Sequence, residues 1–189
     1  MVLQHSRVVR LVVAIAVVAL AAVGLRLSEN EDNFEVVRGV LGEPVPIHGG
    51  TVTASDVRVG TTLVRFRQVE ARTPGLFVVV KIEFAATGTE LIRPPNARLL
   101  SGDRRYEAFS YLGAGNAQPG FQVAVDAVFE VDPAVIDHLT LELYPAELLS
   151  GYTQRTRIHL GITPSNADQW RAAARDQVLE PAESTARGI

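Results

Sequence analysis

The chain has 189 residues, 47% of them apolar, so it is long enough for one domain with a hydrophobic core and additional segments at its ends. It contains no cysteine, which excludes a disulfide framework, a thiol nucleophile, a zinc–thiolate site and a lipidated N-terminal cysteine. Residues 28–189 carry 15 basic against 21 acidic side chains, a net charge of −6, which does not suit a nucleic-acid or anionic-lipid binder.

The first 27 residues have the pattern of an export signal or a membrane anchor. Arg7 and Arg10 precede Leu11–Leu25, a run with no polar side chain. Counted over residues 8–27, the apolar segment is about 30 Å long as a helix, which is enough to span a bilayer. Small residues near its end also fit a signal-peptidase site, so a cleaved signal peptide is the alternative to a single-pass anchor. In either case we expect the N-terminus inside and the domain outside the cytoplasm, in the membrane or secreted.

We expect four segments along the chain. Residues 1–27 are the signal segment, residues 28–48 a polar spacer and lead-in, residues 49–162 a β-sandwich, and residues 163–189 a C-terminal helix with a loose tail. Within residues 49–162, turn residues recur roughly every 8–12 positions, a spacing typical of an all-β sandwich or barrel.

The clearest strand is Phe121–Val131 (FQVAVDAVFEV), bounded by Pro-Gly before it and Asp-Pro after it. Its odd-numbered residues are apolar, from Phe121 onward, and the other face carries Asp126 and Glu130. Alternation over this length predicts one buried and one solvated face. The stretch Thr73–Phe84 (TPGLFVVVKIEF) predicts a central strand: alternate residues from Val78 form its inward row, and Phe77 and Val79 add apolar surface to its second face.

Shorter segments complete the predicted sheet, and one helix follows it. The alternating patterns at 138–144 and 156–162 predict two strands, 98–109 predicts a hairpin, and 51–64 predicts one or two strands. Ser165–Leu179 has a Ser or Asn N-cap, an acid in its first turn and a thin apolar stripe that includes Trp170. We expect this helix to pack on the sandwich or on its membrane-proximal side.

The order of landmarks resembles a known group. A strand led by Gly-Gly (Gly49–Val59) comes first, then TPGLFVVVKIEF, a Gly-Asp turn followed by Tyr106, and a PGF start to a strand that ends in FEVDP. This is similar to the exported bacterial immunoglobulin-like domains of unknown function, to which the mycobacterial immunoprotective extracellular protein is structurally related. The resemblance spans about Gly49–Ile162. It implies an immunoglobulin-like sandwich of about seven strands, secreted or membrane-tethered. It carries no catalytic residue to transfer. The excess of 17 arginines over a single lysine separately indicates the coding bias of a GC-rich, actinobacterial type of genome.

The sequence predicts no catalytic, cofactor-binding or metal site. The four histidines lack helical spacing to one another, and Asp126 and Glu130 would lie about 13 Å apart on a strand, beyond the roughly 5–9.5 Å of glycosidase acid pairs. Nucleophile and phosphate-loop motifs are absent from the sequence. The basic cluster Arg58, Arg65, Arg67 and Arg72 is interpreted as ordinary surface.

Two places are candidates for binding a partner. The segment Ser110–Gly120 is long for a hairpin connection and carries Tyr111 and Leu112 beside glycines, a composition suited to binding a partner. The alternative is that Tyr111 packs down onto the core as a plug. Trp170 on the C-terminal helix is the second candidate. The predicted function is a non-catalytic, membrane-anchored binding module for a protein or cell-envelope component. The alternatives are an accessory subunit that docks through its helix and a secreted hydrolase.

Overall fold

A computed structural model describes residues 35–111, 115–144 and 154–189. The predicted membrane segment 8–27, the spacer 28–34 and Leu112 lie outside these residues. Val36–Ile189 form one compact unit. In the three described ranges, no helix combines the length and the apolar character needed to cross a membrane.

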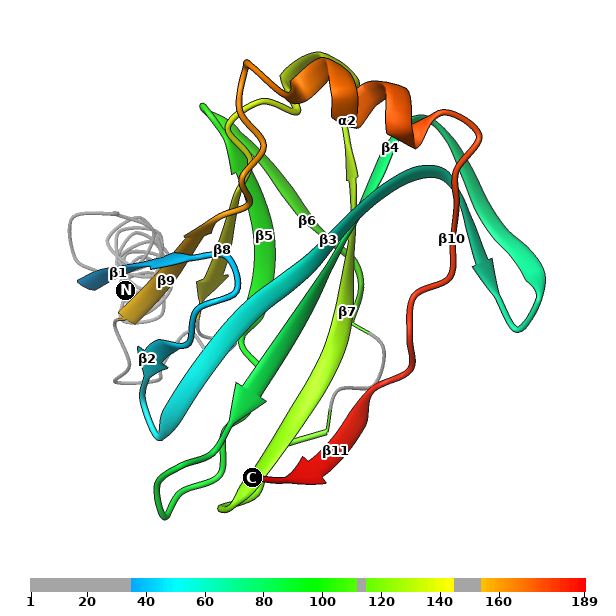
Figure 1. The fold of residues 1–189 in the computed structure, drawn as a ribbon. Coiled ribbons are helices and arrows are strands. Elements are labelled where there is room, and N and C mark those ends of the chain that lie inside the picture. Colours follow the sequence, from blue (N-terminus) through cyan, green and yellow to red (C-terminus); the bar gives the residue numbers. More distant parts are fainter. Residues whose placement is uncertain (1–34, 112–114, 145–153) are drawn as a thin grey trace, which may run out of the picture. The chain divides into compact units, whose positions relative to one another are not determined.

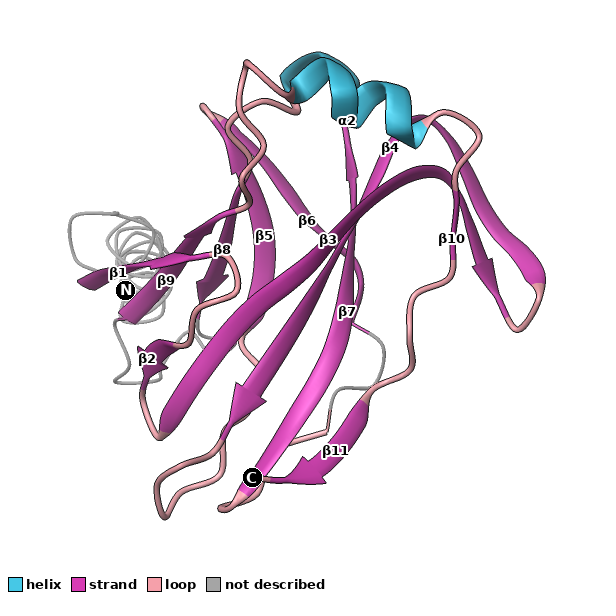
Figure 2. Ribbon diagram, viewed as in Figure 1, coloured by secondary structure: helices cyan, strands magenta, loops and turns pink. Residues whose placement is uncertain are grey.

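The described residues are mostly strand, as Figure 2 shows. One α-helix, α2, and one 3-10 turn, η2, interrupt the strands. In chain order the elements are β1 Glu35–Val40, β2 Val45–Ile47, β3 Gly50–Arg65, β4 Gln68–Ala85, β5 Asn96–Ser101, β6 Arg104–Tyr111, β7 Phe121–Val131, η2 Pro133–Val135, β8 Thr140–Tyr144, β9 Gln154–His159, α2 Ala167–Ala174, β10 Val178–Leu179 and β11 Thr185–Gly188.

The strands form two mainly antiparallel layers that share β6 (Figure 1). Sheet A has the order β1-β9-β8-β5-β6, and sheet B continues as β6-β7-β4-β3-β10, with β10 parallel to β3. The first half of β6 pairs with β5, and its second half pairs with β7 after a register shift between Ala108 and Ser110. A strand that changes sheets in this way closes one corner of a sandwich. The chain is therefore a β-sandwich, as its alternating patterns predict.

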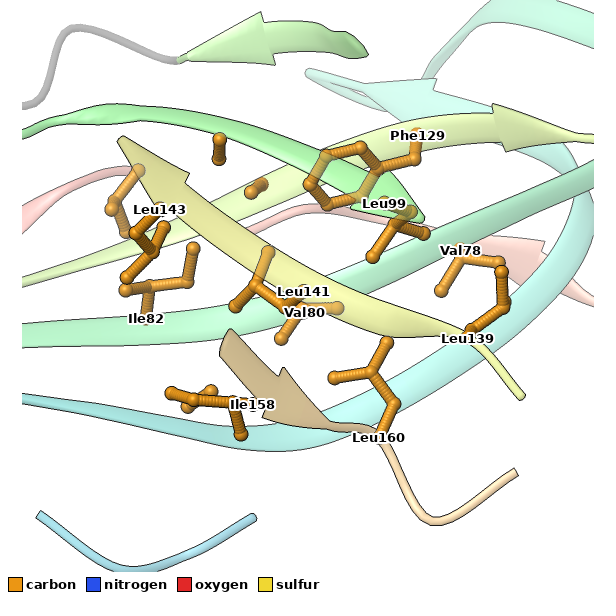
Figure 3. Close-up of a cluster of buried hydrophobic side chains, with 14 of the residues drawn as sticks. Val78, Val80, Ile82, Leu99, Phe129, Leu139, Leu141, Leu143, Ile158 and Leu160 are labelled. Atoms are coloured by element: carbon orange, nitrogen blue, oxygen red, sulfur yellow. The ribbon is translucent and has the colours of Figure 1, made fainter. Parts of the chain in front are cut away.

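The main core lies between the two sheets. The inward row of β4, from Val78 to Phe84, is fully buried as predicted. It meets Leu99 of β5, Leu141 of β8 and Ile158 of β9 across the gap, and Figure 3 shows these side chains converging. Each such side chain stabilises the fold by about 1.5–3 kcal/mol relative to remaining in water.

A second, smaller core covers the outer face of sheet B. Phe77 and Val79 of β4 and Val128 of β7 pack there with Leu63 of β3 and Leu179 of β10. The prediction that β4 is covered on both faces near its start is thus confirmed. The covering side chain Leu179 comes from the C-terminal segment, which the sequence pattern did not connect with this face.

Several expectations require correction. Residues 35–111, 115–144 and 154–189 contain 11 strands rather than about seven. The sheets extend beyond residues 49–162, because β2 pairs with β3, β10 pairs with β3, and β11 pairs with β7. The tail expected to be loose therefore contains β11. Helix α2 starts after Asn166, as expected, but it is shorter than Ser165–Leu179: Arg175 is extended, and Asp176 has a φ of +57°.

The two faces of β7 also differ from expectation. Phe121, expected inward, is 48% exposed because it lies at the end of the strand. Asp126, expected on a wet face, is only 2% exposed because the C-terminal segment crosses over it. The alternation in β7 thus located the inner face correctly from Val123 to Val131 but not the cover on the other side.

Candidate interaction site

The residues predicted to bind a partner lie on separate elements. Tyr111 is the last residue of β6 and pairs through its backbone with Ala127 of β7, while its side chain is outside the described part. Leu112 lies outside the described residues altogether. Trp170 is half-buried on α2 and packs against the main core, so much of its ring surface is already used within the domain.

The two carboxylates considered as a catalytic pair serve the fold. Asp126 accepts hydrogen bonds from Arg58 Nη2 at 2.5 Å and from the backbone N–H of Ala182 at 2.7 Å. Glu130 is exposed and accepts a hydrogen bond from the hydroxyl of Thr73. No group of three or more histidine and acidic side chains suited to a metal ion occurs in residues 35–111, 115–144 and 154–189.

The turn between β3 and β4 has an unusual backbone. Arg65 pairs with Gln68, so the turn itself consists of Phe66 and Arg67. Both have positive φ, at +51° and +61°. Two consecutive positive φ angles define the turn that suits a two-residue hairpin, for which Asn-Gly is the preferred sequence. A bulky residue in this region costs about 1–2 kcal/mol, so this turn stores strain that Asn-Gly would avoid.

The same turn presents apolar and cationic side chains to solvent. Phe66 is 74% exposed and Val69 is 54% exposed, the former being the most exposed of the large hydrophobic side chains in the described ranges. Arg67 and Arg72 are exposed, and Arg65 pairs with Glu70 at 3.2 Å. We call residues 64–72 the β3–β4 tip. It has three arginines and one glutamate, so its net charge is positive, whereas residues 28–189 as a whole carry a net negative charge.

The β3–β4 tip is held from below. Leu63, at the base of the hairpin, is 1% exposed and packs in the smaller core with Phe77 and Leu179. Above it the ladder shifts register between Leu63 and Val64, which leaves Glu70 as the extra residue of a bulge on β4. Figure 1 shows the hairpin extending past β10, on the side of the domain opposite β1. Aromatic residues and arginine are enriched in protein interfaces and carry much of their binding energy. The β3–β4 tip presents both residue types on a well-packed base.

Local sequence patterns did not predict the turn at the β3–β4 tip. The turn contains no Gly, Pro, Asn or Asp, which are the residues that usually announce a turn. The four arginines that appeared as one basic cluster are also divided by the fold. Arg58 binds Asp126 beneath the C-terminal segment, whereas Arg65, Arg67 and Arg72 belong to the β3–β4 tip. The available signal for a hairpin here was that two long strand-like segments are separated by only the four residues RFRQ.

A row of alternating charges crosses the outer face of sheet A. Glu107, Arg98, Glu142 and Arg157 are direct neighbours across β6, β5, β8 and β9. Glu142 is fully buried and accepts hydrogen bonds from Arg98 Nε at 2.6 Å and Arg157 Nε at 2.8 Å. The Arg98 guanidinium also lies 4.6 Å from the ring centre of Tyr144. Opposite charges placed directly across strands stabilise a sheet.

The charged row sets the protonation of Glu142 and of the neighbouring Tyr144. Burial alone would raise the pKa of Glu142, but the interactions with Arg157 and Arg98 outweigh it and hold this pKa below its usual value of 4.5. Burial and the hydrogen bond to Glu107 raise the pKa of Tyr144 to about 12. Glu142 is therefore an anion and Tyr144 neutral at neutral pH, and the row acts as a structural element of sheet A.

Comparison with known proteins adds one likeness. The chain matches no protein-family model and no curated protein. It is similar to an uncharacterized β-sandwich protein from Clostridium difficile 630, solved as a crystal structure at 1.90 Å resolution. The two share 8% sequence identity with a TM-score of 0.46, over 67% of this chain and 95% of that chain. A likeness this distant transfers no property of that protein to this chain.

Proposed function

We propose that this chain is a non-catalytic binding module of the bacterial cell envelope, which recognises a partner through the β3–β4 tip. It is held at the membrane by residues 8–27, with the domain on the outer side, and its sandwich is of the immunoglobulin-like type. The partner is a protein or an envelope component that offers an apolar pocket edged by negative charge.

The observation that carries the proposal is the strained, exposed turn of Phe66 and Arg67. Asn-Gly would form the same turn with less strain, so the fold alone gives no reason for these residues. A ring that is 74% exposed gains its burial only in a complex. Export as indicated by the N-terminal sequence, and the position of the tip away from β1, fit display of this surface.

The alternatives receive less support. Docking through α2 would use Trp170, whose ring already packs against the core. A hydrolase would need an accessible pair of carboxylates, but Asp126 is buried and tied to Arg58. The exposed apolar and cationic groups of the β3–β4 tip favour binding over either alternative.

A site-specific crosslink tests the proposal, because the natural chain has no cysteine. Gln68→Cys, labelled with a photoreactive maleimide in the full-length chain on intact cells, places the probe at the tip. Asp103→Cys, in the turn between β5 and β6, is the matched control on another exposed hairpin. We expect a discrete crosslinked product from position 68 that is absent from position 103.

Phe66→Asn combined with Gln68→Cys should remove that product, whereas Leu91→Ser, which alters another exposed apolar side chain, should leave it unchanged. The same products from positions 68 and 103, or none from position 68, would contradict the proposal.

Anchoring is tested separately by the mass of the native N-terminus, since a chain that starts at Ala22 or Leu25 is secreted rather than anchored.

A further inference from the structure

The last 15 residues form a separate feature, independent of the β3–β4 tip. Residues 175–189, which we call the C-terminal strap, leave α2 and cross the outer side of sheet B (Figure 1). The strap begins beside β3, where β10 pairs in parallel with Thr62 and Leu63, and it ends beside β7, where β11 pairs antiparallel. It therefore bridges strands that lie on either side of β4.

Strand β3 contacts the start of the strap closely at Gly60 and Thr61. The backbone N–H of Thr61 donates to the carbonyl oxygen of Gln177 at 3.1 Å. A Cβ atom at Gly60 would lie 2.6 Å from that oxygen and 2.8 Å from Leu179 Cγ. Only glycine allows this approach, and Leu179 then fills the smaller core at 3% exposure.

The middle of the strap is tied by a buried charge. The carboxylate of Asp126 accepts a hydrogen bond from the backbone N–H of Ala182 and forms an ion pair with Arg58 Nη2. Arg58 Nη1 lies 3.5 Å from the carbonyl oxygen of Glu180. Pro181, between these two contacts, is buried. Without the strap, Asp126 would lose one of its two hydrogen bonds and the smaller core would lose its cover.

The end of the strap completes a strand edge. Within the described residues, β6 pairs with β7 from Ala127 to Phe129, and β11 pairs with the same edge of β7 from Phe121 to Ala124. All four residues of β11 are exposed, so β11 is held mainly by main-chain pairing, with one ion pair from Arg187 Nη2 to Glu83 at 3.7 Å. Main-chain pairing along an edge is the mode by which an extended segment from another molecule is bound.

The hinge that directs the strap is short and strained. Three residues separate the end of α2 from the start of β10, and among them Arg175 is extended while Asp176 has a φ of +57°. An exchanged strap would make every contact described above, because a second copy has the same sequence. The balance between the closed and exchanged forms is then set by hinge strain and by the entropy of association, and short strained hinges favour exchange.

We propose that the C-terminal strap is exchanged between two copies of this chain, each strap lying on sheet B of the other copy in a two-fold symmetric dimer. The groove formed by Gly60, Leu63, Asp126 and the edge of β7 is a binding site, and residues 178–188 of a second copy are its ligand. Opening of the turn at 175–177 releases the strained φ of Asp176 and directs each strap to its partner.

An engineered disulfide tests the exchange. Ala124 and Thr185 are direct cross-strand partners, and such pairs have Cα atoms about 4.5–5.5 Å apart, within the range that a disulfide accepts. Two full-length chains with different tags, one with Ala124→Cys and the other with Thr185→Cys, are produced in the same cells, and their membranes are oxidised. We expect a disulfide-linked dimer that carries both tags. Asp103→Cys in place of Ala124→Cys is the control and should give none.

The chain that carries both cysteines distinguishes the two forms directly. Exchange predicts that most of it runs as a covalent dimer on a non-reducing gel, and inserting Gly-Ser-Gly after Asp176, which relaxes the hinge, should lower that fraction at least two-fold. An intrachain bond without any mixed-tag dimer would overturn the proposal, because each strap would then stay on its own chain. Failure to form a disulfide in either arrangement would also contradict it, since neither form would place residues 124 and 185 together.

Discussion

Two hairpins of this sandwich differ in how their turns are built. The turn between β5 and β6 uses Gly102 and Asp103, with Gly102 at a φ of +56° and nothing within 4 Å of where its Cβ would be. The turn between β3 and β4 puts Phe66 and Arg67 at two positive φ angles. The first turn uses glycine where a left-handed residue is needed. The second turn keeps two large side chains in a strained conformation, which is the observation behind the proposed binding role.

The supports beneath the two turns differ as well. The β5–β6 hairpin is attached to sheet A through the charged row that contains Arg98 and the buried Glu142. The β3–β4 hairpin is supported by apolar packing of Leu63 against Phe77 and Leu179. The contrast predicts different responses to substitution, to acid and to changes in each turn.

The largest effect is expected from Glu142→Ala. Removing this carboxylate leaves Arg98 and Arg157 without their shared buried partner, and breaking a buried ion pair on one side costs about 3–5 kcal/mol. Urea denaturation of the full-length chain in detergent measures this loss. Glu107→Ala, at the exposed end of the same row, should cost less than about 1 kcal/mol. Equal losses from the two variants would mean that burial of Glu142 does not set the strength of the row.

Leu179→Ala tests the apolar support and should have the next largest effect. A buried leucine truncated to alanine costs about 2–5 kcal/mol, and we expect a value near the lower end because the strap can settle into the space. The same denaturation experiment measures it. Val178→Ala, on the exposed side of β10, is the control and should change stability little. If both variants are neutral, the strap does not support the base of the β3–β4 hairpin.

Much of this account could be predicted from the sequence, and the missing parts share a cause. Turn residues predicted the ends of β7. Alternation predicted the inward rows of β4 and β8, because a strand with one face on the core carries that information locally. The burial of Asp126 depends on Arg58 and Ala182, which are 68 and 56 residues away. A local pattern around Asp126 cannot predict that the C-terminal segment covers this side chain.

The turn at Phe66 was missed for a different reason. Turn prediction depends on residues that favour positive φ, and this turn has none of them. Its existence is dictated by the pairing of β3 with β4 on both sides, from Thr51 with Ala85 to Arg65 with Gln68. The proposed interaction site therefore lies where tertiary pairing overrides local preference, which is where functional residues are expected to break local rules.

A smaller effect is expected when the strain is introduced into the other hairpin. Gly102→Phe places a bulky residue at a φ of +56°, where nothing lies within 4 Å of the added Cβ, so the backbone conformation should account for a cost of about 1–2 kcal/mol. Thermal unfolding measures it, and Asp103→Arg is the control that changes the neighbouring residue. An unchanged melting temperature for Gly102→Phe would show that positive φ carries no penalty in this sandwich, and the inference drawn from Phe66 would fail with it.

Acid should weaken sheet A gradually. The folded-state pKa of Glu142 lies below its usual value of 4.5, so the stability that this carboxylate contributes is fully present above pH 4.5 and is lost as the pH falls through the lowered pKa. Melting temperatures between pH 7 and pH 3 measure the loss. Glu142→Gln should flatten that part of the curve, and an acid response identical to that of the natural chain would show that other groups produce it.

The double variant Phe66→Asn, Arg67→Gly tests the central claim most directly, because it replaces the strained turn with the sequence that the hairpin prefers. Its melting temperature and the crosslink from Gln68→Cys are measured on the same preparation. We expect stability to rise by about 1–2 kcal/mol, equivalent to roughly 3–6 °C for a chain of this size, while the crosslinked product disappears. A lower melting temperature with the crosslink retained would contradict the account, because Phe66 and Arg67 would then serve the fold and not a partner.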